Sequence, residues 1–276
     1  MNYLNAPNKF VKFGDMLYAY RIVGKKSLIP LVLLQHFRGS MDNWDPAFIN
    51  ALAEEHTVIT FDNKGVGLSE GETPDNFAEM GDDAASFINA LGYEIVDILG
   101  FSIGGAIAQE LTVNHPQLVR KLILAATAPK GGEGINQRDP EIIKIVSKPD
   151  FEDEDFLTLF FEPSARSQEL GRASIKRRMQ RKKYFDAVIS TQTAHAHAKA
   201  RQGWGLPADA SFEYLKQIKQ PVLVANGKND IMMFTINSYT LFEHLPNARL
   251  LLYPDSGHGF LFQNTQDFAK QVCQFL

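Results

Sequence analysis

Short apolar runs recur along the chain and alternate with stretches that have the spacing of amphipathic helices. Near-continuous apolar runs rich in β-branched residues and leucine are typical of strands buried on both faces, as in a parallel sheet covered by helices. Six such strands are predicted, at 31–34, 58–61, 95–99 (interrupted by Asp97), 122–125, 222–225 and 250–253. Ahead of them, residues 10–13 and 16–22 predict an antiparallel hairpin around Gly14-Asp15.

Helical candidates lie between these strands. They cover residues 45–55, 79–91, 103–115, 234–244 and 264–275. Because strand and helix alternate along the chain, the sequence predicts an α/β fold with a mostly parallel, doubly wound sheet.

The alternation stops between residues 128 and 219, where a charged and mostly helical pattern follows Pro129-Lys130-Gly131-Gly132. We predict a core made of residues 1–128 and 219–276, with a helical lid inserted at 129–218. The lid sequence runs from an acidic segment at 152–155 to basic segments at 176–178 and 181–183. We interpret the basic segments as a solvated helix face opposite the acidic one, rather than as a nucleic-acid site.

Composition and charge exclude few functions. A chain of 276 residues is long enough for one large domain with an inserted lobe. Its formal net charge of -4 gives no electrostatic reason to expect nucleic acid or an anionic membrane as partner. The apolar runs are too short to span a membrane, and the first ten residues lack the pattern of a signal peptide. A cytoplasmic location is the default expectation.

The single cysteine, Cys273, excludes an internal disulfide and any Cys-based metal cluster. It lies in an apolar stretch near the C-terminus, where we expect a buried and inert thiol. We predict no metal, no cofactor, no nucleic acid and no membrane as partner, and a small-molecule substrate.

The strongest chemical signal is Gly100-Phe101-Ser102-Ile103-Gly104-Gly105, which joins a predicted strand to a predicted helix. A serine on a sharp strand-to-helix turn lifts its hydroxyl above the sheet, and glycines two residues before and after it let the strand and helix approach closely. The motif predicts that Ser102 is a nucleophile. The alternative is an ordinary glycine turn.

A serine hydroxyl is a poor nucleophile at neutral pH and needs an adjacent base. His258 follows the last predicted strand, and loops after the carboxyl ends of parallel strands open on one edge of the sheet. We therefore predict His258 as the base. His195 and His197 lie two positions apart on a predicted helix and would point in different directions, which disfavours a shared metal.

A carboxylate must hold the imidazole in the correct tautomer. Asp230 follows the strand at 222–225, so it lies at the same edge of the sheet as Ser102 and His258. The chain order Ser102, Asp230, His258 is also typical of hydrolases with this elbow. Asp255, three residues ahead of the histidine, is the alternative.

Acyl transfer also needs donors for the oxyanion of the tetrahedral intermediate. We predict the backbone amide of Ile103, directly after the nucleophile, and that of Phe37, in the loop after the strand at 31–34. A plain loop with the Phe37 side chain as a core plug is the alternative.

Taken together, these motifs resemble the α/β-hydrolase superfamily over nearly the full chain, which implies the α/β-hydrolase fold. The stretch from Asp62 to Ser69 resembles the family's aspartate-x-arginine-glycine-x-glycine-x-serine turn, with Lys64 in place of the arginine. The family usually has histidine-glycine ahead of the oxyanion loop, where this chain has Gln35-His36. Because His36 adds a side chain at the glycine position, the sequence does not determine the shape of the oxyanion hole.

The sequence thus predicts a serine hydrolase that cleaves a small ester, lactone or related acyl substrate through an acyl-Ser102 intermediate. A cofactor-free haloperoxidase or perhydrolase, a carbon–carbon bond hydrolase or an amidase would use the same residues. A ligand-binding or non-catalytic protein on this fold is the alternative of a different class, and the oligomeric state stays open. Aromatic residues of the predicted lid either line an acyl pocket or pack the lid onto the core: Phe151, Phe156, Phe160, Phe161 and Trp204.

Overall fold

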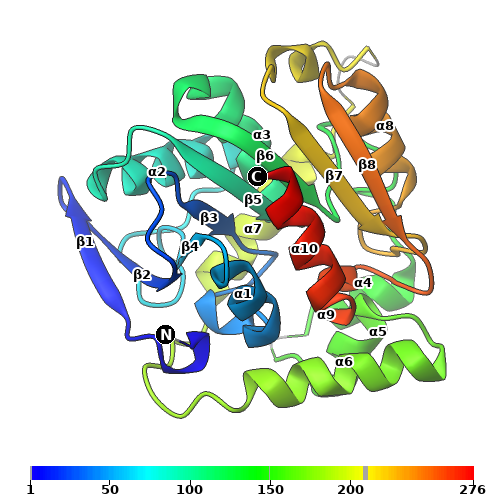
Figure 1. The fold of residues 1–276 in the computed structure, drawn as a ribbon. Helices are drawn as coiled ribbons and strands as arrows, with labels where there is room; N and C mark the ends of the chain where they lie inside the picture. The colour runs from blue at the N-terminus through cyan, green and yellow to red at the C-terminus, as the bar shows by residue number, and fades with distance from the viewer. Residues whose placement is uncertain (1, 149, 208–210) are drawn as a thin grey trace.

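One eight-stranded sheet forms the centre of the computed structural model, which describes residues 2–148, 150–207 and 211–276 (Figure 1). The spatial order of its strands is β1-β2-β4-β3-β5-β6-β7-β8. Only the pairings of β2 with β1 and with β4 are antiparallel, and the other pairings are parallel. The strands are β1 (Lys9–Phe13), β2 (Met16–Gly24), β3 (Leu31–Leu34), β4 (Thr57–Phe61), β5 (Val96–Phe101), β6 (Val119–Ala125), β7 (Val222–Gly227) and β8 (Ala248–Tyr253).

The predicted strands and the mostly parallel, doubly wound sheet are confirmed. The largest difference at the start of a strand is in β6, which begins at Val119 rather than at residue 122. The added residues include Arg120, which is partly exposed and donates to both carboxylate oxygens of Asp97 on β5, at 2.9 and 2.6 Å. The side chain of Asp97 is fully buried, so this pair also accounts for the polar interruption in the apolar run of β5.

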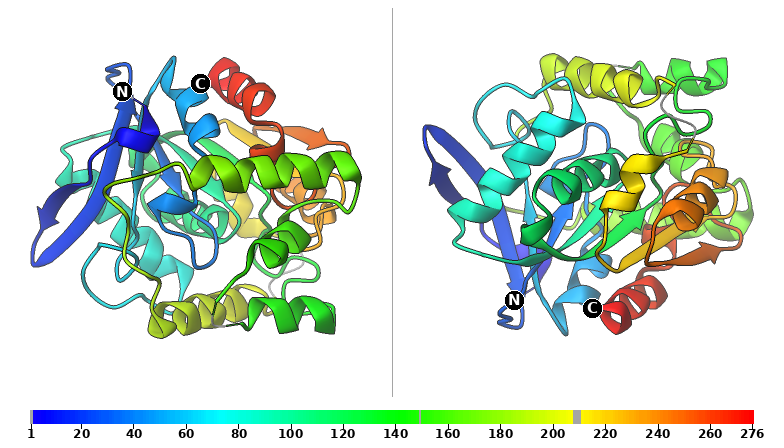
Figure 2. Two further views of the ribbon diagram at one scale, coloured as in Figure 1. Left: turned by 90° about the horizontal axis from the view of Figure 1, so that it is seen from below. Right: turned by 90° about the horizontal axis from the view of Figure 1, so that it is seen from above.

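Helices cover both faces of the sheet (Figure 2). Helices α1 and α10 lie on one face, and α2, α3 and α8 lie on the other. The α-helices are α1 (Pro46–Ala53), α2 (Phe77–Ala90), α3 (Ile103–Asn114), α4 (Pro140–Val146), α5 (Asp153–Phe160), α6 (Ala165–Arg178), α7 (Thr191–Trp204), α8 (Ile236–His244), α9 (Phe260–Gln263) and α10 (Thr265–Phe275). Short 3-10 helices are η1 (Tyr3–Asn5), η2 (Met41–Asn43), η3 (Pro116–Leu118) and η4 (Glu213–Gln217).

Capping residues explain where several helices begin. Asp45 accepts a hydrogen bond from the Ala47 amide at 2.9 Å, and Pro46 follows as the first residue of α1. Asn76 caps α2 in the same way, which starts that helix two residues before the predicted position. Ser102 stands at the same position before α3 but makes no side-chain cap, so its hydroxyl remains available for another partner.

Residues 129–218, called here the helical segment, connect β6 to β7. Their described part contains α4 to α7 and η4 and no strand. Helices α5 and α6 lie beyond the carboxyl ends of β7 and β8 (Figure 1). Whether this segment acts as a lid separable from the core stays a prediction.

No α-helix among the described residues has the length and apolar content needed to cross a membrane.

Candidate active site

Ser102 lies on the sharp turn between β5 and α3. Its backbone φ is +59° and its ψ is -122°, a conformation that a residue with a side chain adopts only when its surroundings enforce it. Two hydrogen bonds hold the turn: the Ser102 amide donates to Ala125 O and the Gly105 amide donates to Ser102 O, both at 2.9 Å. These contacts hold Ser102 in a strained backbone conformation, and that conformation fixes the position of its hydroxyl.

The glycines of the elbow are required by close packing. A Cβ on Gly100 would lie 2.4 Å from the carbonyl oxygen of Gly104, and a Cβ on Gly104 would lie 2.3 Å from the carbonyl oxygen of Leu34. Both obstacles are backbone atoms, which cannot move aside as a flexible side chain can. The G-x-S-x-G spacing thus lets α3 start directly against β5 and β3.

The structure brings Ser102, His258 and Asp230 together in one hydrogen-bonded row. The Nε2 atom of His258 lies 2.9 Å from Ser102 Oγ, and its Nδ1 atom lies 2.8 Å from Asp230 Oδ2. A carboxylate only accepts hydrogen bonds, so Nδ1 carries the proton and Nε2 can accept the one on the serine hydroxyl. All three residues are buried.

Asp230 is itself held in place by its own loop. Its Oδ1 atom accepts hydrogen bonds from the amides of Met232 and Met233, at 2.7 and 2.9 Å, which leaves Oδ2 for His258. Asp255, the alternative from the sequence, instead has its Oδ2 atom 3.4 Å from Arg166 Nη1. Of the two candidate carboxylates, Asp230 is the one that contacts the imidazole.

Aromatic rings enclose His258. The ring of Phe101 lies 5.1 Å from the imidazole and the ring of Phe160 lies 5.2 Å from it, measured between centroids. Phe160 belongs to α5, and its carbonyl accepts the Gly259 amide at 2.6 Å. The helical segment therefore forms part of the wall around the imidazole.

The structure places Phe37 and Ile103, whose amides are predicted to bind the oxyanion, in the loop after β3 and at the start of α3, near the carboxyl ends of the strands. Ile103 is the first residue of α3, so its amide has no carbonyl partner within the helix. Phe37 lies in a turn closed by a hydrogen bond from the Gly39 amide to His36 O at 2.9 Å, with Arg38 at a φ of +57°. Phe37 and Ile103 line the same cavity as Ser102.

His36, at the position where the family usually has glycine, is buried and forms part of the loop. Its Nδ1 atom lies 2.9 Å from Phe37 O, and its ring packs edge-on against Phe101 and Phe160. Burial lowers the pKa of His36 to about 3, so the ring is neutral near neutral pH. The His36 amide donates a hydrogen bond to Gln35 Oε1 at 2.9 Å, which also stabilises the loop.

Two cavities meet at Ser102. The larger has a volume of about 470 Å³ and is lined by α4, α7 and the loop after β7. The smaller, of about 180 Å³, is lined by His258 and by Phe151, Phe156 and Phe160 of the helical segment. The other two aromatic residues singled out from the sequence, Phe161 and Trp204, are buried in the hydrophobic core. A groove of about 730 Å³ between α2 and α7 does not include Ser102 among its described lining residues.

The expectation of a solvated basic face holds for Lys176, Lys182 and Lys183, which are exposed, and is wrong for the arginines of the same segments. Arg177 binds Asp45 of the core, with Nε 2.9 Å from Oδ1, and Arg181 is buried against the N-terminal residues, where it donates to Tyr3 O at 2.9 Å. Arg178 lies over the ring of Phe156 at 4.1 Å. Arg177 and Arg181 face inward because the core offers them a carboxylate and backbone carbonyls, and Arg178 because its guanidinium packs on an aromatic ring.

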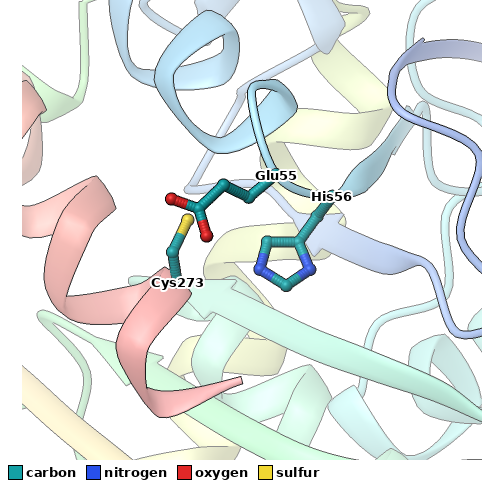
Figure 3. Close-up of side chains that lie close together, drawn as sticks. All are labelled: Glu55, His56 and Cys273. Atoms are coloured by element: carbon teal, nitrogen blue, oxygen red, sulfur yellow. The ribbon is translucent and has the colours of Figure 1, made fainter.

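A separate group of side chains has the chemistry of metal ligands. Ligand atoms of Glu55, His56 and Cys273 lie within 4.8 Å of one another (Figure 3). Cys273 is half-buried, rather than buried as expected, and burial followed by the charges of Glu55 and Glu54 raises its pKa to about 11. Since His56 directly precedes β4, the group lies at the opposite edge of the sheet from Ser102 and plays no part in its chemistry.

Sequence reasoning missed the cationic lining of the larger cavity, above all Arg138 and Arg201. They lie 63 positions apart in the numbering, in the loop before α4 and on α7, and no local motif links them. Only the packing of the helical segment brings them to the same cavity.

Comparisons with known proteins agree with this fold. A family model described as alpha/beta hydrolase fold matches residues 29–265. A solved alpha/beta hydrolase fold protein from Chitinophaga pinensis is 42% identical, with a TM-score of 0.93, and the match covers 100% of this chain and 98% of that one. The poly(3-hydroxyalkanoate) depolymerase of Ectopseudomonas oleovorans is 29% identical over 92% of this chain and 86% of its own length. The meta-cleavage product hydrolase of Pseudomonas fluorescens IP01 shares 21% identity and a TM-score of 0.76, over 97% of this chain and 96% of that one.

Proposed function

Since the chain belongs to the alpha/beta hydrolase fold family, we propose that it is a serine hydrolase that cleaves a small ester, lactone or related acyl substrate through an acyl-Ser102 intermediate. The observation that carries the proposal is the row of hydrogen bonds from Ser102 Oγ through His258 to Asp230, at 2.9 and 2.8 Å. A buried serine, imidazole and carboxylate in this order match what nucleophilic acyl transfer requires.

In the first half of the reaction, Ser102 Oγ attacks the substrate carbonyl while His258 Nε2 takes the hydroxyl proton. Asp230 stabilises the resulting imidazolium through Nδ1–H. The carbonyl oxygen becomes an oxyanion, for which the amides of Phe37 and Ile103 are the proposed donors. Collapse of the tetrahedral intermediate breaks the bond to the leaving group, which departs with the proton from Nε2.

The second half repeats these steps with water. His258 Nε2 removes a proton from a water molecule, whose oxygen attacks the acyl-Ser102 carbonyl. The same amides stabilise the second oxyanion. When this intermediate collapses, Ser102 Oγ recovers its proton from Nε2 and the acid product is released. No cofactor takes part in this scheme.

We also propose that the helical segment acts as a lid over the site. Phe160 supports this because its ring contacts His258 and its carbonyl accepts the Gly259 amide. A wall of this kind excludes water from the imidazole, and its displacement would admit substrate.

The names of the relatives favour hydrolysis without selecting the bond. One is named as a depolymerase of poly(3-hydroxyalkanoate), and the other as a hydrolase of a meta-cleavage product. An ester or lactone suits the proposed oxyanion donors and base, and an amide or a carbon–carbon bond would use the same residues, so the substrate panel decides between them.

Labelling with a fluorophosphonate tests the proposal directly. The protein should take up one label on the peptide that contains Ser102, and Ser102→Ala should take up none. Turnover on a panel of esters, lactones and amides then identifies the bond. Persistent labelling of the Ser102→Ala protein would reject Ser102 as the nucleophile, and absence of labelling in the unmodified protein would favour a non-catalytic member of the fold.

A further inference from the structure

Positive charge is concentrated in the larger cavity beside Ser102. Four cationic side chains line it: Arg38, Arg138, Lys148 and Arg201. Among the described residues that line this cavity there is no aspartate or glutamate. The remaining lining is largely apolar and includes Ile143, Val146 and Met233.

Carboxylates offset the charge of two of these cations, since Asp155 pairs with Lys148 and the charge of Asp150 acts on Arg38. Lys148 Nζ lies 2.7 Å from Asp155 Oδ1. Arg38 donates to Lys148 O at 2.7 Å, and its guanidinium lies 4.8 Å from the ring centre of Phe151. The positive charge that is left without a counter-ion in this cavity therefore comes from Arg138 and Arg201.

Arg138 and Arg201 contact only neutral acceptors. Arg138 donates to Met232 O at 3.3 Å, and its Nε atom is buried without a hydrogen-bond partner. Arg201 donates to the carbonyl of Ile135 and, at 3.3 Å, to Asn136 Oδ1. Within the described part of the chain, no carboxylate comes within 4.0 Å of either guanidinium.

Such an arrangement is unfavourable without an anion. Both arginines are half-buried, and withdrawing a cation from water without a paired carboxylate costs free energy. Two neighbouring cations also repel each other. Burial and the charge of Arg201 outweigh the charge of Asp230, which raises the pKa of Arg138, and lower that pKa to about 10, so Arg138 remains protonated at neutral pH. The two residues come from the loop before α4 and from α7, which lie next to each other in the molecule (Figure 2). A bound carboxylate would supply the missing acceptors, including one for Arg138 Nε.

The position of His258 indicates which half of the substrate carries that anion. His258 lines the smaller cavity and must protonate the leaving group, so the leaving group belongs there. Ile103, a proposed oxyanion donor, lines the larger cavity, which is therefore the place for the acyl chain.

We propose that the substrate is an acyl compound whose acyl chain ends in a carboxylate bound by Arg138 and Arg201, with a small apolar or aromatic leaving group held against Phe151, Phe156 and Phe160. The apolar side chains between Ser102 and the two arginines would contact the methylene groups of the chain. This assignment rests on the proposed function and names its substrate class.

A comparison of three activated esters tests the assignment on the unmodified protein. Mono(4-nitrophenyl) adipate carries the free carboxylate, methyl 4-nitrophenyl adipate carries the same chain with the carboxylate capped, and 4-nitrophenyl hexanoate lacks it. We expect kcat/KM for the free acid to exceed that for the capped ester by about 10- to 100-fold, the range of a charge-assisted hydrogen bond. Equal values for the two adipates would overturn the assignment.

Variants then ask whether the two arginines are responsible. Arg138→Met and Arg201→Met should each lower the ratio of kcat/KM for free over capped adipate by about 10-fold. Arg201→Lys should retain part of the preference because it keeps the charge. The control is Arg172→Met, since Arg172 is an exposed arginine of the same helical segment that binds Glu154 outside the cavity. If Arg138→Met or Arg201→Met only disturbed the loop that holds Asp230, the variant would slow all three esters equally. An unchanged ratio of free over capped adipate in these variants would contradict the proposal.

A binding measurement separates this proposal from the proposed function. If the unmodified protein takes up no fluorophosphonate, the serine hydrolase assignment fails, but the carboxylate site can still be examined. Calorimetry on Ser102→Ala with monomethyl adipate and with dimethyl adipate reads binding alone. Binding of the monomethyl ester only, lost in the double variant with Arg138→Met, would support the carboxylate site. Equal binding of the two, or binding of neither, would overturn it.

Discussion

Arg177 of α6 binds the carboxylate of Asp45 through two nitrogens, with its Nε atom 2.9 Å from Oδ1 and its Nη2 atom 2.5 Å from Oδ2. The Asp45 side chain is fully buried and at the same time caps α1. One carboxylate therefore organises a helix of the core and also holds the helical segment against it.

We expect Arg177→Met to loosen this attachment. Removal of one partner leaves a buried carboxylate without its cation, which costs about 3 kcal/mol in comparable pairs. The free energy of unfolding, measured in urea, should fall by about that amount, and limited proteolysis should cut within 129–218 more rapidly. Arg172→Met, which removes an exposed pair on the same helix, should leave both measurements close to those of the unmodified protein. Equal effects of the two changes would mean that the pair with Asp45 does not hold the segment.

The role of Asp230 can be tested without disturbing the fold. Asp230→Asn keeps the shape of the side chain but favours the wrong tautomer of His258. It should lower kcat by about 10⁴-fold, as the equivalent change does in serine proteases, or about 5.4 kcal/mol at the transition state. Because the three residues act as a unit, adding Ser102→Ala to this variant should cost little more than Ser102→Ala alone.

Asp255→Asn is the matched control for this experiment. Asp255 lies in the same loop as His258, but its carboxylate faces Arg166. The change should have little effect on kcat. If Asp255→Asn were the crippling variant and Asp230→Asn the mild one, the assignment of the carboxylate would be wrong.

Gly104→Ala tests the packing of the elbow. The new Cβ would lie 2.3 Å from Leu34 O and 2.7 Å from Gln35 O, so α3 and the loop after β3 would have to separate. We expect a loss of about 3 kcal/mol in the free energy of unfolding, as for other overpacked sites. Gly203→Ala on α7 meets no atom within 4 Å and should stabilise the protein by about 0.5–1 kcal/mol. Equal effects of the two changes would contradict the packing argument.

Acid should destabilise the protein through its buried histidines. Burial lowers the pKa of His197 to about 4, whereas the imidazole of an unfolded chain titrates near about 6.5. Between these pH values the unfolded chain binds a proton that the folded chain does not, so the free energy of unfolding falls as the pH falls through this window. At pH 5 the loss from His197 is about 2 kcal/mol relative to pH 7.

Urea unfolding of His197→Gln at pH 7 and at pH 5 measures this contribution. A glutamine can still accept the Arg38 amide, which the His197 Nδ1 atom accepts at 3.2 Å. The variant should lose less stability than the unmodified protein between the two pH values. The matched control is His195→Gln, a change at the exposed histidine two residues earlier on α7. An unchanged pH dependence in His197→Gln would show that this imidazole is not the group that titrates.

The sheet and the position of Ser102, His258 and Asp230 were accessible from the sequence because each depends on a local signal combined with one topological rule. Apolar runs locate the buried strands, and the glycine spacing locates the elbow. The carboxyl ends of parallel strands then share one edge of the sheet, which places three distant loops together. The start of β6 was not predicted, because Arg120 reads as polar in the local pattern and its partner, the buried Asp97, lies on the neighbouring strand.

Tertiary structure alone decided how the helical segment meets the core. Its charges and aromatic rings have no fixed direction until the helices dock, so the sequence could not tell an inward Arg178 from a solvated one, or a pocket-lining Phe160 from the core residue Trp204. The same holds for Arg138 and Arg201, whose shared cavity exists only after two remote segments pack together. Side-chain patterns specify elements locally, whereas the lining of a cavity is set by which surfaces become neighbours.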